Sequence, residues 1–273
     1  MLGQAIKHGS LPAAKVLVFM GAKVDAEDGA PVIKIPLQRA IIWCQQDLAL
    51  FFLEKGASVH RKDSDGLTAL ARAGGEAEWS NFDKDFRLMK ELLRLGADVN
   101  ARDRYGNTIL MHTCGRKIVE FLLRNGADPK ARNNSGQSVL HSCYYTDALP
   151  LLLEHGVDAS VRDSTGQTPL FEIMSGNNYG IREQILTNVE LMIKAGLDPK
   201  ARDKWGHRAI YYALEKGLDD YVAFLERHGA GEEMTPELAA TLENELAGML
   251  FRRMHALRRA SGCEVTLRNG EQM

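Results

Sequence analysis

The chain has 273 residues, of which 45% are hydrophobic and 26% charged, and its formal net charge is -2. Such a composition indicates a folded protein with a substantial core. The near-neutral charge argues against a global attraction to nucleic acid or to an anionic membrane. The four cysteines form no CxxC pair, which is typical of reduced thiols in a cytoplasmic protein. No apolar run is long enough to cross a membrane.

From the N-terminus onward, one phrase returns seven times: two apolar residues, often leucines, followed shortly by glycine and commonly by Ala-Asp. Its first copy lies in a segment whose apolar run is interrupted by Lys15, so we predict folded structure there and no signal peptide. The glycines of the phrase are Gly21, Gly56, Gly96, Gly126, Gly156, Gly196 and Gly229. A second glycine follows five of them ten residues later, and these are Gly66, Gly106, Gly136, Gly166 and Gly206.

Each second glycine precedes a short phrase that is typical of the start of a helix. Threonine, or Ser138 in one copy, stands where its side chain can cap that helix, and Pro169 suits a first helical turn. Glycine after the preceding helix can adopt the left-handed conformation of a C-cap. One apolar residue in the corresponding segment of each of the seven repeats, including the first two, which lack a second glycine, is predicted to point into the core. These residues are Leu2, Leu37, Leu70, Leu110, Leu140, Leu170 and Ile210.

These phrases resemble the ankyrin repeat. The segments GQTPL at Gly166–Leu170 and GADVNARD at Gly96–Asp103 are near-literal matches to its consensus. The resemblance implies an all-α solenoid of about seven helix–turn–helix units with short hairpin loops, in which neighbouring units bury each other's apolar faces. The predicted domain covers residues 1–234, with units near 1–28, 29–63, 64–103, 104–133, 134–163, 164–203 and 204–234.

Two units are about ten residues longer than their neighbours, and the extra residues fall between the two helices of the unit. We expect loops there, at Gly74–Arg87 and Ser175–Asn188, because insertions in solenoids map to loops on one face. These segments carry Trp79, Phe82 and Tyr179. The aromatic side chains could contact a partner or could pin a long loop to the body of the protein.

Residues 235–260 are predicted to form one amphipathic helix, followed by a loose tail at 261–273. The helix could cap the exposed end of the solenoid, as the ends of repeat arrays require. Alternatively it could bind a partner or mediate dimerisation through its basic residues, which are Arg252, Arg253, Arg258 and Arg259.

No catalytic, metal-binding or cofactor-binding constellation is predicted. The best candidate for a metal site is His112, Cys114, His141 and Cys143, but the registers of the two pairs are staggered. We therefore expect His141 to hydrogen-bond within the scaffold, as the resemblance implies, and the thiols to be buried. All glycines are explained by turns, so no phosphate-binding loop is predicted.

The expected hairpin tips carry a cation at one equivalent position in five units: Lys62, Arg102, Arg132, Arg162 and Arg202. We call these residues the cation ladder. Two interpretations stay open, since each cation could pair locally with the acidic or amide residue that follows it, or the ladder could face an acidic partner surface.

Two tips add an aromatic residue beside a cation, at Arg104–Tyr105 and Lys204–Trp205. Tyr, Trp and Arg contribute much of the binding energy at interfaces, and Trp205 has no evident packing role at a tip. We therefore predict Tyr105 and Trp205 as the main anchors. Asn107 and Tyr145 complete the set of predicted partner-binding residues together with the ladder arginines, Trp79, Phe82 and Tyr179.

The resemblance implies a non-catalytic module that binds another protein through its hairpin tips and concave inner-helix face. We expect a monomer whose partner carries an acidic surface patch. The arrangement is similar to that of bacterial ankyrin proteins, some of which are immunity proteins that block a toxin. The alternatives are a secreted effector that binds a host protein, and a nucleic-acid-binding solenoid that uses the basic tips, which the near-neutral charge disfavours.

Overall fold

The computed structural model describes residues 2–25, 35–76, 82–113, 115–143, 146–175 and 182–230. The chain divides into two compact units, Met1–Val157 and Asp158–Met273. Within the described ranges the secondary structure is helical apart from one isolated bridge between Arg202 and Arg208.

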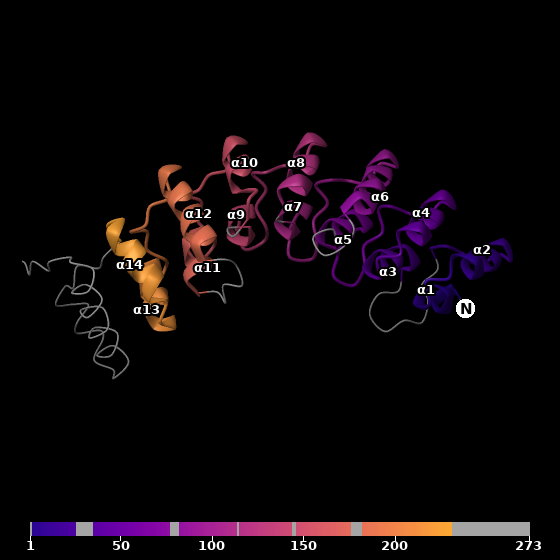
Figure 1. The fold of residues 1–273 in the computed structure, drawn as a ribbon, viewed down its shortest axis with the longest axis horizontal. Helices are drawn as coiled ribbons and strands as arrows, with labels where there is room; N and C mark the ends of the chain where they lie inside the picture. The colour runs from indigo at the N-terminus through magenta and orange to yellow at the C-terminus, as the bar shows by residue number, and fades with distance from the viewer. Residues whose placement is uncertain are drawn as a thin grey trace, which may run out of the picture. The chain divides into compact units, whose positions relative to one another are not determined.

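The described residues of the first unit form five helix pairs. Each pair has an odd-numbered inner helix and an even-numbered outer helix (Figure 1). The pairs are α1 (Leu2–Lys7) with α2 (Leu11–Phe19), α3 (Pro36–Ile42) with α4 (Gln46–Glu54), α5 (Ala69–Glu76) with α6 (Phe82–Arg94), α7 (Ile109–His112) with α8 (Arg116–Arg124), and α9 (Val139–Ser142) with α10 (Leu149–Glu154). Inner helices pack on inner helices along the unit, as α3 does on α5 and α5 on α7.

In its described residues, the second unit contains two pairs of the same kind, α11 (Pro169–Ser175) with α12 (Arg182–Lys194) and α13 (Ala209–Lys216) with α14 (Asp219–Arg227). The inner helices α11 and α13 pack against each other, and α14 packs on α13. Pro169 occupies the first position of α11, as predicted.

The core follows the apolar stripe of the repeated phrase. The seven residues predicted to point inward are all buried, from Leu2 at 9% exposure to Leu37, Leu140 and Ile210 at 0%. Because the inner helices are only four to eight residues long, packing of this stripe between neighbours rather than helix propensity holds them in place.

The caps of the inner helices differ among themselves. The Ser138 side chain accepts a hydrogen bond from the Leu140 backbone N–H at 3.3 Å, and the Thr68 hydroxyl accepts one from Ala71 at 3.3 Å. At Thr108 the predicted side-chain cap is not formed, although this threonine is buried. The cap is therefore not what starts α7.

The hairpins between successive helix pairs approach each other so closely that glycine is required at their tips. A Cβ atom on Gly66, at φ +78°, would lie 2.5 Å from the backbone N of Arg104, and one on Gly106, at φ +80°, 2.8 Å from that of Asn134. Backbone bonds run across this contact, since Asn134 N donates to Tyr105 O at 2.9 Å. Within the first compact unit, the tips at Gly66 and Gly106 are therefore each seated on the tip that follows.

The two insertions differ from the expected long loops. Most of Gly74–Arg87 is helical, because α5 runs through Gly74 to Glu76 and α6 begins at Phe82. Likewise α12 begins at Arg182, so it takes up part of the second insertion. The apolar spacing of α6 buries Leu88, Met89 and Leu92, which favours helix over loop.

Gly74 itself has a packing role that the loop interpretation missed. A Cβ atom there would lie 2.8 Å from Ile109 Cδ1 and 2.9 Å from Thr113 Cγ2. Glycine therefore lets α5 and α7 approach closely inside the first unit.

Several predictions fall outside the described residues. These are the C-terminal helix at 235–260, the tail at 261–273, and the side chains of Trp79, Tyr145, Tyr179 and Phe82, of which Phe82 has a described backbone in α6. In the described part of the chain, no helix is both long and apolar enough to cross a membrane.

Candidate protein-binding surface at the hairpin tips

Each hairpin is built around one acidic or amide side chain that accepts hydrogen bonds from the backbone of its own turn. Asp103 Oδ1 accepts from the N–H groups of Tyr105 and Asn107, both at 2.8 Å. The same pattern of bonds to the residues two and four positions ahead is made by Asp63, Asn133, Asp163 and Asp203. These five residues fix the backbone of the tips.

In three of these hairpins, the second carboxylate oxygen of the aspartate binds a side chain on the inner helix that follows. Arg72 Nε donates to Asp63 Oδ2 at 2.8 Å, His112 Nε2 lies 2.9 Å from Asp103 Oδ2, and the Tyr212 hydroxyl donates to Asp203 Oδ2 at 2.7 Å. All three partners stand nine positions after the aspartate. A sequence search for this spacing could have found them, but the residue type differs in every case.

These hydrogen bonds also shift the pKa values of Asp103, Asp203 and Tyr212. Burial alone would raise the pKa of Asp103, but the bonds from Asn107, His112 and Tyr105 outweigh it and hold this pKa below the usual value. The pKa of Asp203 is lowered in the same way, chiefly by Tyr212 against the effect of burial. Burial and the bond to Asp203 raise the pKa of Tyr212. Asp103 and Asp203 are therefore charged at neutral pH.

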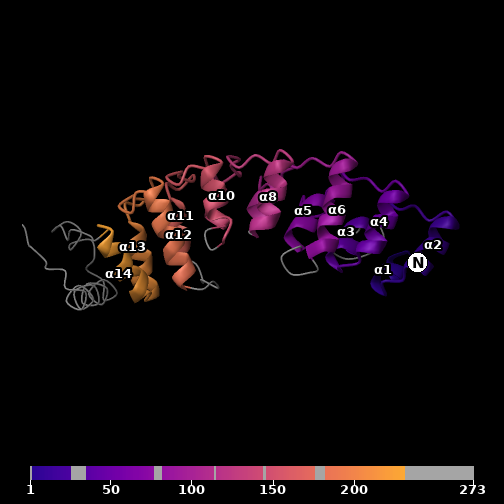
Figure 2. The same cartoon turned by 45° about the horizontal axis from the view of Figure 1, so that its top comes forward.

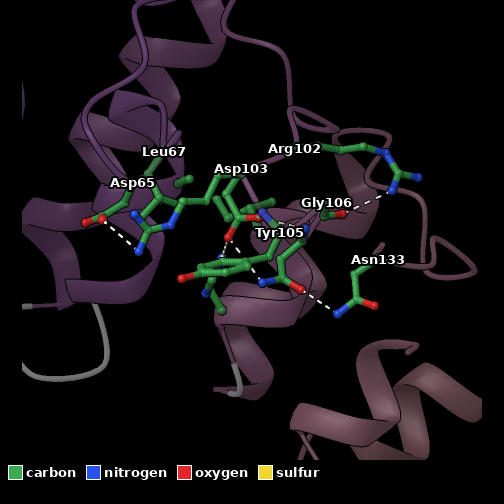
Figure 3. Close-up of polar contacts among 12 residues, drawn as sticks. Asp65, Leu67, Arg102, Asp103, Tyr105, Gly106 and Asn133 are labelled. Atoms are coloured by element: carbon green, nitrogen blue, oxygen red, sulfur yellow. Dashed lines mark hydrogen bonds and ion pairs between the residues drawn. The ribbon is translucent and has the colours of Figure 1, made fainter. Parts of the chain in front are cut away.

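The cation ladder is part of the same scaffold. The Arg102 guanidinium donates to the carbonyl oxygen of Gly106 in its own tip at 3.0 Å (Figure 3). It also donates to the carbonyl oxygen of Arg132 in the next tip at 2.5 Å. Arg162 repeats this in the second unit, with Gly166 at 3.0 Å and Arg202 at 2.6 Å.

The other ladder members make related bonds. Lys62 Nζ donates to the Arg102 carbonyl at 2.8 Å, Arg132 Nε to that of Gly136 at 2.7 Å, and Arg202 to that of Gly206 at 2.5 Å. All five side chains belong to exposed residues. Lys62, Arg102 and Arg162 thus link tips through carbonyl oxygens, while the charge of the whole ladder stays in contact with solvent.

The Arg104–Tyr105 pair stands on top of this scaffold in the first unit. The Tyr105 residue is 57% exposed, and the Arg104 guanidinium lies 4.7 Å from the centroid of its ring. Arg104 also forms an ion pair with Asp65 of the preceding tip at 3.4 Å. Because the Tyr105 backbone is bonded on both sides, the ring is presented to solvent from a fixed position.

The Lys204–Trp205 pair has the same geometry in the second unit. Trp205 is 57% exposed, and Lys204 Nζ lies 4.4 Å from the centroid of its ring. The Trp205 N–H donates to Asp203 at 2.9 Å, and Lys204 N–H donates to the Thr165 carbonyl at 2.9 Å. The other tips carry small polar residues at the two equivalent positions, namely Ser64–Asp65, Asn134–Ser135 and Ser164–Thr165.

The side chain of Asn107 lies between two tips. Its side-chain amide donates to Asp103 at 3.1 Å, and its Oδ1 accepts from Asn133 Nδ2 at 2.8 Å. Figure 3 shows Asn133 reaching toward this hairpin from the next tip. Asn107 therefore joins two tips through its side-chain amide, and its contact with a partner stays a prediction.

His112 and His141, two of the residues considered for a metal site, bind different groups of the scaffold. His112 binds Asp103, whereas the His141 ring accepts a hydrogen bond from the Ser138 backbone at 3.1 Å inside the scaffold. Cys143 is fully buried, and its Sγ lies 3.2 Å from the Thr113 carbonyl. Cys114 lies outside the described residues, among which no cluster of three metal-binding side chains occurs.

Comparisons with known proteins agree with this architecture. Residues 77–163 match the family model for ankyrin repeats in three copies. A putative ankyrin repeat protein of Rickettsia felis is 35% identical over 102 residues, which cover 37% of this chain and 44% of that protein. Ankyrin repeat and SOCS box protein 6 of Homo sapiens is 34% identical over 105 residues, which cover 38% of this chain and 23% of that protein. The chain matches less than half the length of either curated relative.

The stacked helix pairs, the tip-to-tip hairpins and these matches define a helical repeat protein. The chain contains ankyrin repeats, which the family model matches at residues 77–163. Ankyrin repeats generally bind other proteins and are generally not enzymes.

Proposed function

We propose that the chain is a non-catalytic binding protein that holds its partner protein through the Arg104–Tyr105 and Lys204–Trp205 tips. One observation carries the proposal: two of five otherwise equivalent tips present an aromatic ring, 57% exposed, beneath a cation. A ring already held in position loses little conformational entropy on binding, and its burial releases water from a large apolar area.

The cation ladder has a second role in this proposal. Its guanidinium groups are bonded to carbonyl oxygens but remain exposed, so their positive charge acts on an approaching surface. An acidic patch on the partner would be attracted to this edge of each unit before the aromatic side chains are buried. We propose a monomeric, cytoplasmic protein for this function, with inhibition of a toxin as its narrower form.

The test is quantitative affinity capture from the native cell, followed by mass spectrometry. The wild-type chain is compared with Tyr105→Ala/Trp205→Ala and with the matched control Ser135→Ala/Thr165→Ala, whose substitutions stand at the same tip position. We expect the aromatic variant to recover at least about tenfold less of the specific partner, since truncated aromatic anchors commonly cost ~2 kcal/mol or more. The control should recover as much as the wild type.

Equal recovery with the aromatic variant would reject the tips as the anchor. Recovery of nucleic acid in place of protein, with binding that falls steeply as salt rises, would reject protein binding altogether. A recovered partner whose toxicity the chain does not suppress would reject the toxin-inhibitor form and leave the tip proposal standing.

A further inference from the structure

The outer helices of the first unit form a groove that the tip surface does not use. It has a volume of about 1130 Å³ and is lined by residues of α2, α4 and α6. In both views these three helices follow one another along the outer side of the first unit, and α4 packs on both of its neighbours (Figures 1 and 2). We call this feature the outer groove.

The floor of the outer groove is apolar. Leu11 of α2, Leu50 and Phe51 of α4, and Phe86 of α6 line it. Phe19, the last residue of α2, is 92% exposed, and Met20, which follows it, is 76% exposed. An apolar surface of this kind beside a groove is typical of a site for another apolar surface.

The rim of the outer groove is basic. Glu91 is already bound by Arg94 at 2.7 Å, and Glu54 by Lys55 at 3.0 Å. Lys15 and Lys90 are exposed and form no ion pair with any other residue in the described ranges. The free charge around the apolar floor is therefore mainly positive.

Among the residues that the structure describes, Asp47 is the rim carboxylate that forms no ion pair, and it lies in the first turn of α4. The partial positive charge of the helix N-terminus stabilises an acidic side chain at that position. Asp47 therefore leaves the lysines on the opposite helices, Lys15 on α2 and Lys90 on α6, available to an anionic ligand.

We propose that the outer groove is a second docking site, which takes an amphipathic helix of a partner protein whose apolar face is flanked by acidic side chains. The apolar face would cover Leu50 and Phe51, and the flanking carboxylates would pair with Lys15 and Lys90. Packing of a helix along a hydrophobic groove is a common mode of peptide recognition. The site is separate from the hairpin tips, so it would hold a second partner or a second part of the same partner.

The shape of the site favours a helix over a lipid surface. A membrane surface is broad, whereas the apolar floor lies between helices α2, α4 and α6. A single helix, about 10 Å in diameter, presents a narrow apolar face to such a groove.

The test uses the full chain and a fluorescent helical peptide of about 18 residues with leucines along one face and glutamates on both flanks. A second peptide carries lysine in place of every glutamate. Fluorescence anisotropy should show at least about tenfold tighter binding of the glutamate peptide. Lys15→Glu/Lys90→Glu should weaken it by about tenfold and improve binding of the lysine peptide. The control Lys7→Glu/Lys23→Glu, with the same change in charge outside the groove, should change it by less than about twofold.

Equal binding of the two peptides, or equal loss in the control variant, would overturn the proposal. So would binding to phosphatidylserine vesicles that Lys15→Glu/Lys90→Glu abolishes while the glutamate peptide fails to bind. Tyr105→Ala/Trp205→Ala should leave peptide binding unchanged, which separates failure of this site from failure of the tips. Circular dichroism of each variant checks that the fold is kept.

Discussion

The cation ladder and the two cation–aromatic tips occupy the same hairpins, yet their side chains have different surroundings. Arg102 donates both of its described bonds to carbonyl oxygens of the turns. Arg104, two residues later, lies over the ring of Tyr105, and that ring contacts solvent. Position at a tip therefore does not show by itself what a basic residue does. Arg102 holds the hairpins together through carbonyl oxygens, whereas Arg104 supports an exposed aromatic ring.

The largest effect on stability should come from the glycine on which the tips stack. Gly106→Ala would force an L-residue into φ +80° and place a Cβ atom 2.8 Å from the backbone N of Asn134. We expect a loss of at least about 2 kcal/mol, because the left-handed conformation costs roughly 1–2 kcal/mol and the contact adds to it. Urea unfolding followed by circular dichroism measures this loss.

Gly96→Ala is the matched control, since Gly96 has φ +88° but nothing within 4 Å of the added Cβ atom. It should lose about 1 kcal/mol. Equal losses in the two variants would show that the tips are not seated on each other as described.

A somewhat smaller effect is expected for the aspartate inside the hairpin. Asp103→Ala removes the acceptor of the Tyr105 and Asn107 N–H groups and should lose about 2 kcal/mol at neutral pH. Asp103→Asn should lose less, because Asn133 makes the same backbone bonds in the next tip.

The two variants also differ from the wild type in acid. The folded chain holds the pKa of Asp103 below its ordinary value of 3.8, so the resulting stability is present above that pH and is lost as the pH falls through the folded pKa. Urea midpoints measured from pH 6 down to about pH 2.5 should therefore fall less steeply in Asp103→Asn than in the wild type. Parallel curves would contradict the assignment.

The ladder should contribute less to stability than the aspartates. Arg102→Ala removes bonds to Gly106 and Arg132 and should lose about 1 kcal/mol. Arg102→Lys keeps the charge but not the planar group that reaches two carbonyl oxygens, so it should recover only part of the loss. Full recovery in thermal unfolding would mean that the charge alone matters.

The tip aromatics should have the smallest effect on stability. Trp205→Ala and Tyr105→Ala remove side chains of half-exposed residues, so each should change the free energy of unfolding by less than about 0.5 kcal/mol. A larger loss in urea unfolding would show that these rings are structural and would remove the contrast with the ladder.

The sequence was sufficient to predict the repeat architecture because glycine and the apolar stripe repeat at fixed spacing. The buried residues from Leu2 to Ile210 and the left-handed glycines follow from that spacing. The ladder was also visible, but the bonds that join it to adjacent repeats were not. Arg102 meets the carbonyl of Arg132 only after the tips have stacked.

Other features could not be predicted because they depend on packing between helices. Gly74 was placed in a loop, whereas it lies within α5 against Ile109. The partners of the tip aspartates, Arg72, His112 and Tyr212, share a position but no residue type, so no motif marks them. The outer groove combines residues of three repeats, and periodicity alone assigns its floor to the core.

Surface plasmon resonance with the captured partner tests most directly whether the tip aromatics anchor the partner and the cation ladder steers it. If the tips anchor and the ladder steers, Tyr105→Ala/Trp205→Ala should raise the dissociation rate at least about tenfold. Arg102→Ala/Arg162→Ala, measured where that variant is folded, should chiefly lower the association rate, by about twofold to tenfold, and weaken its salt dependence. The reverse result, with the aromatic variant unchanged in dissociation and the ladder variant releasing the partner faster, would contradict the account.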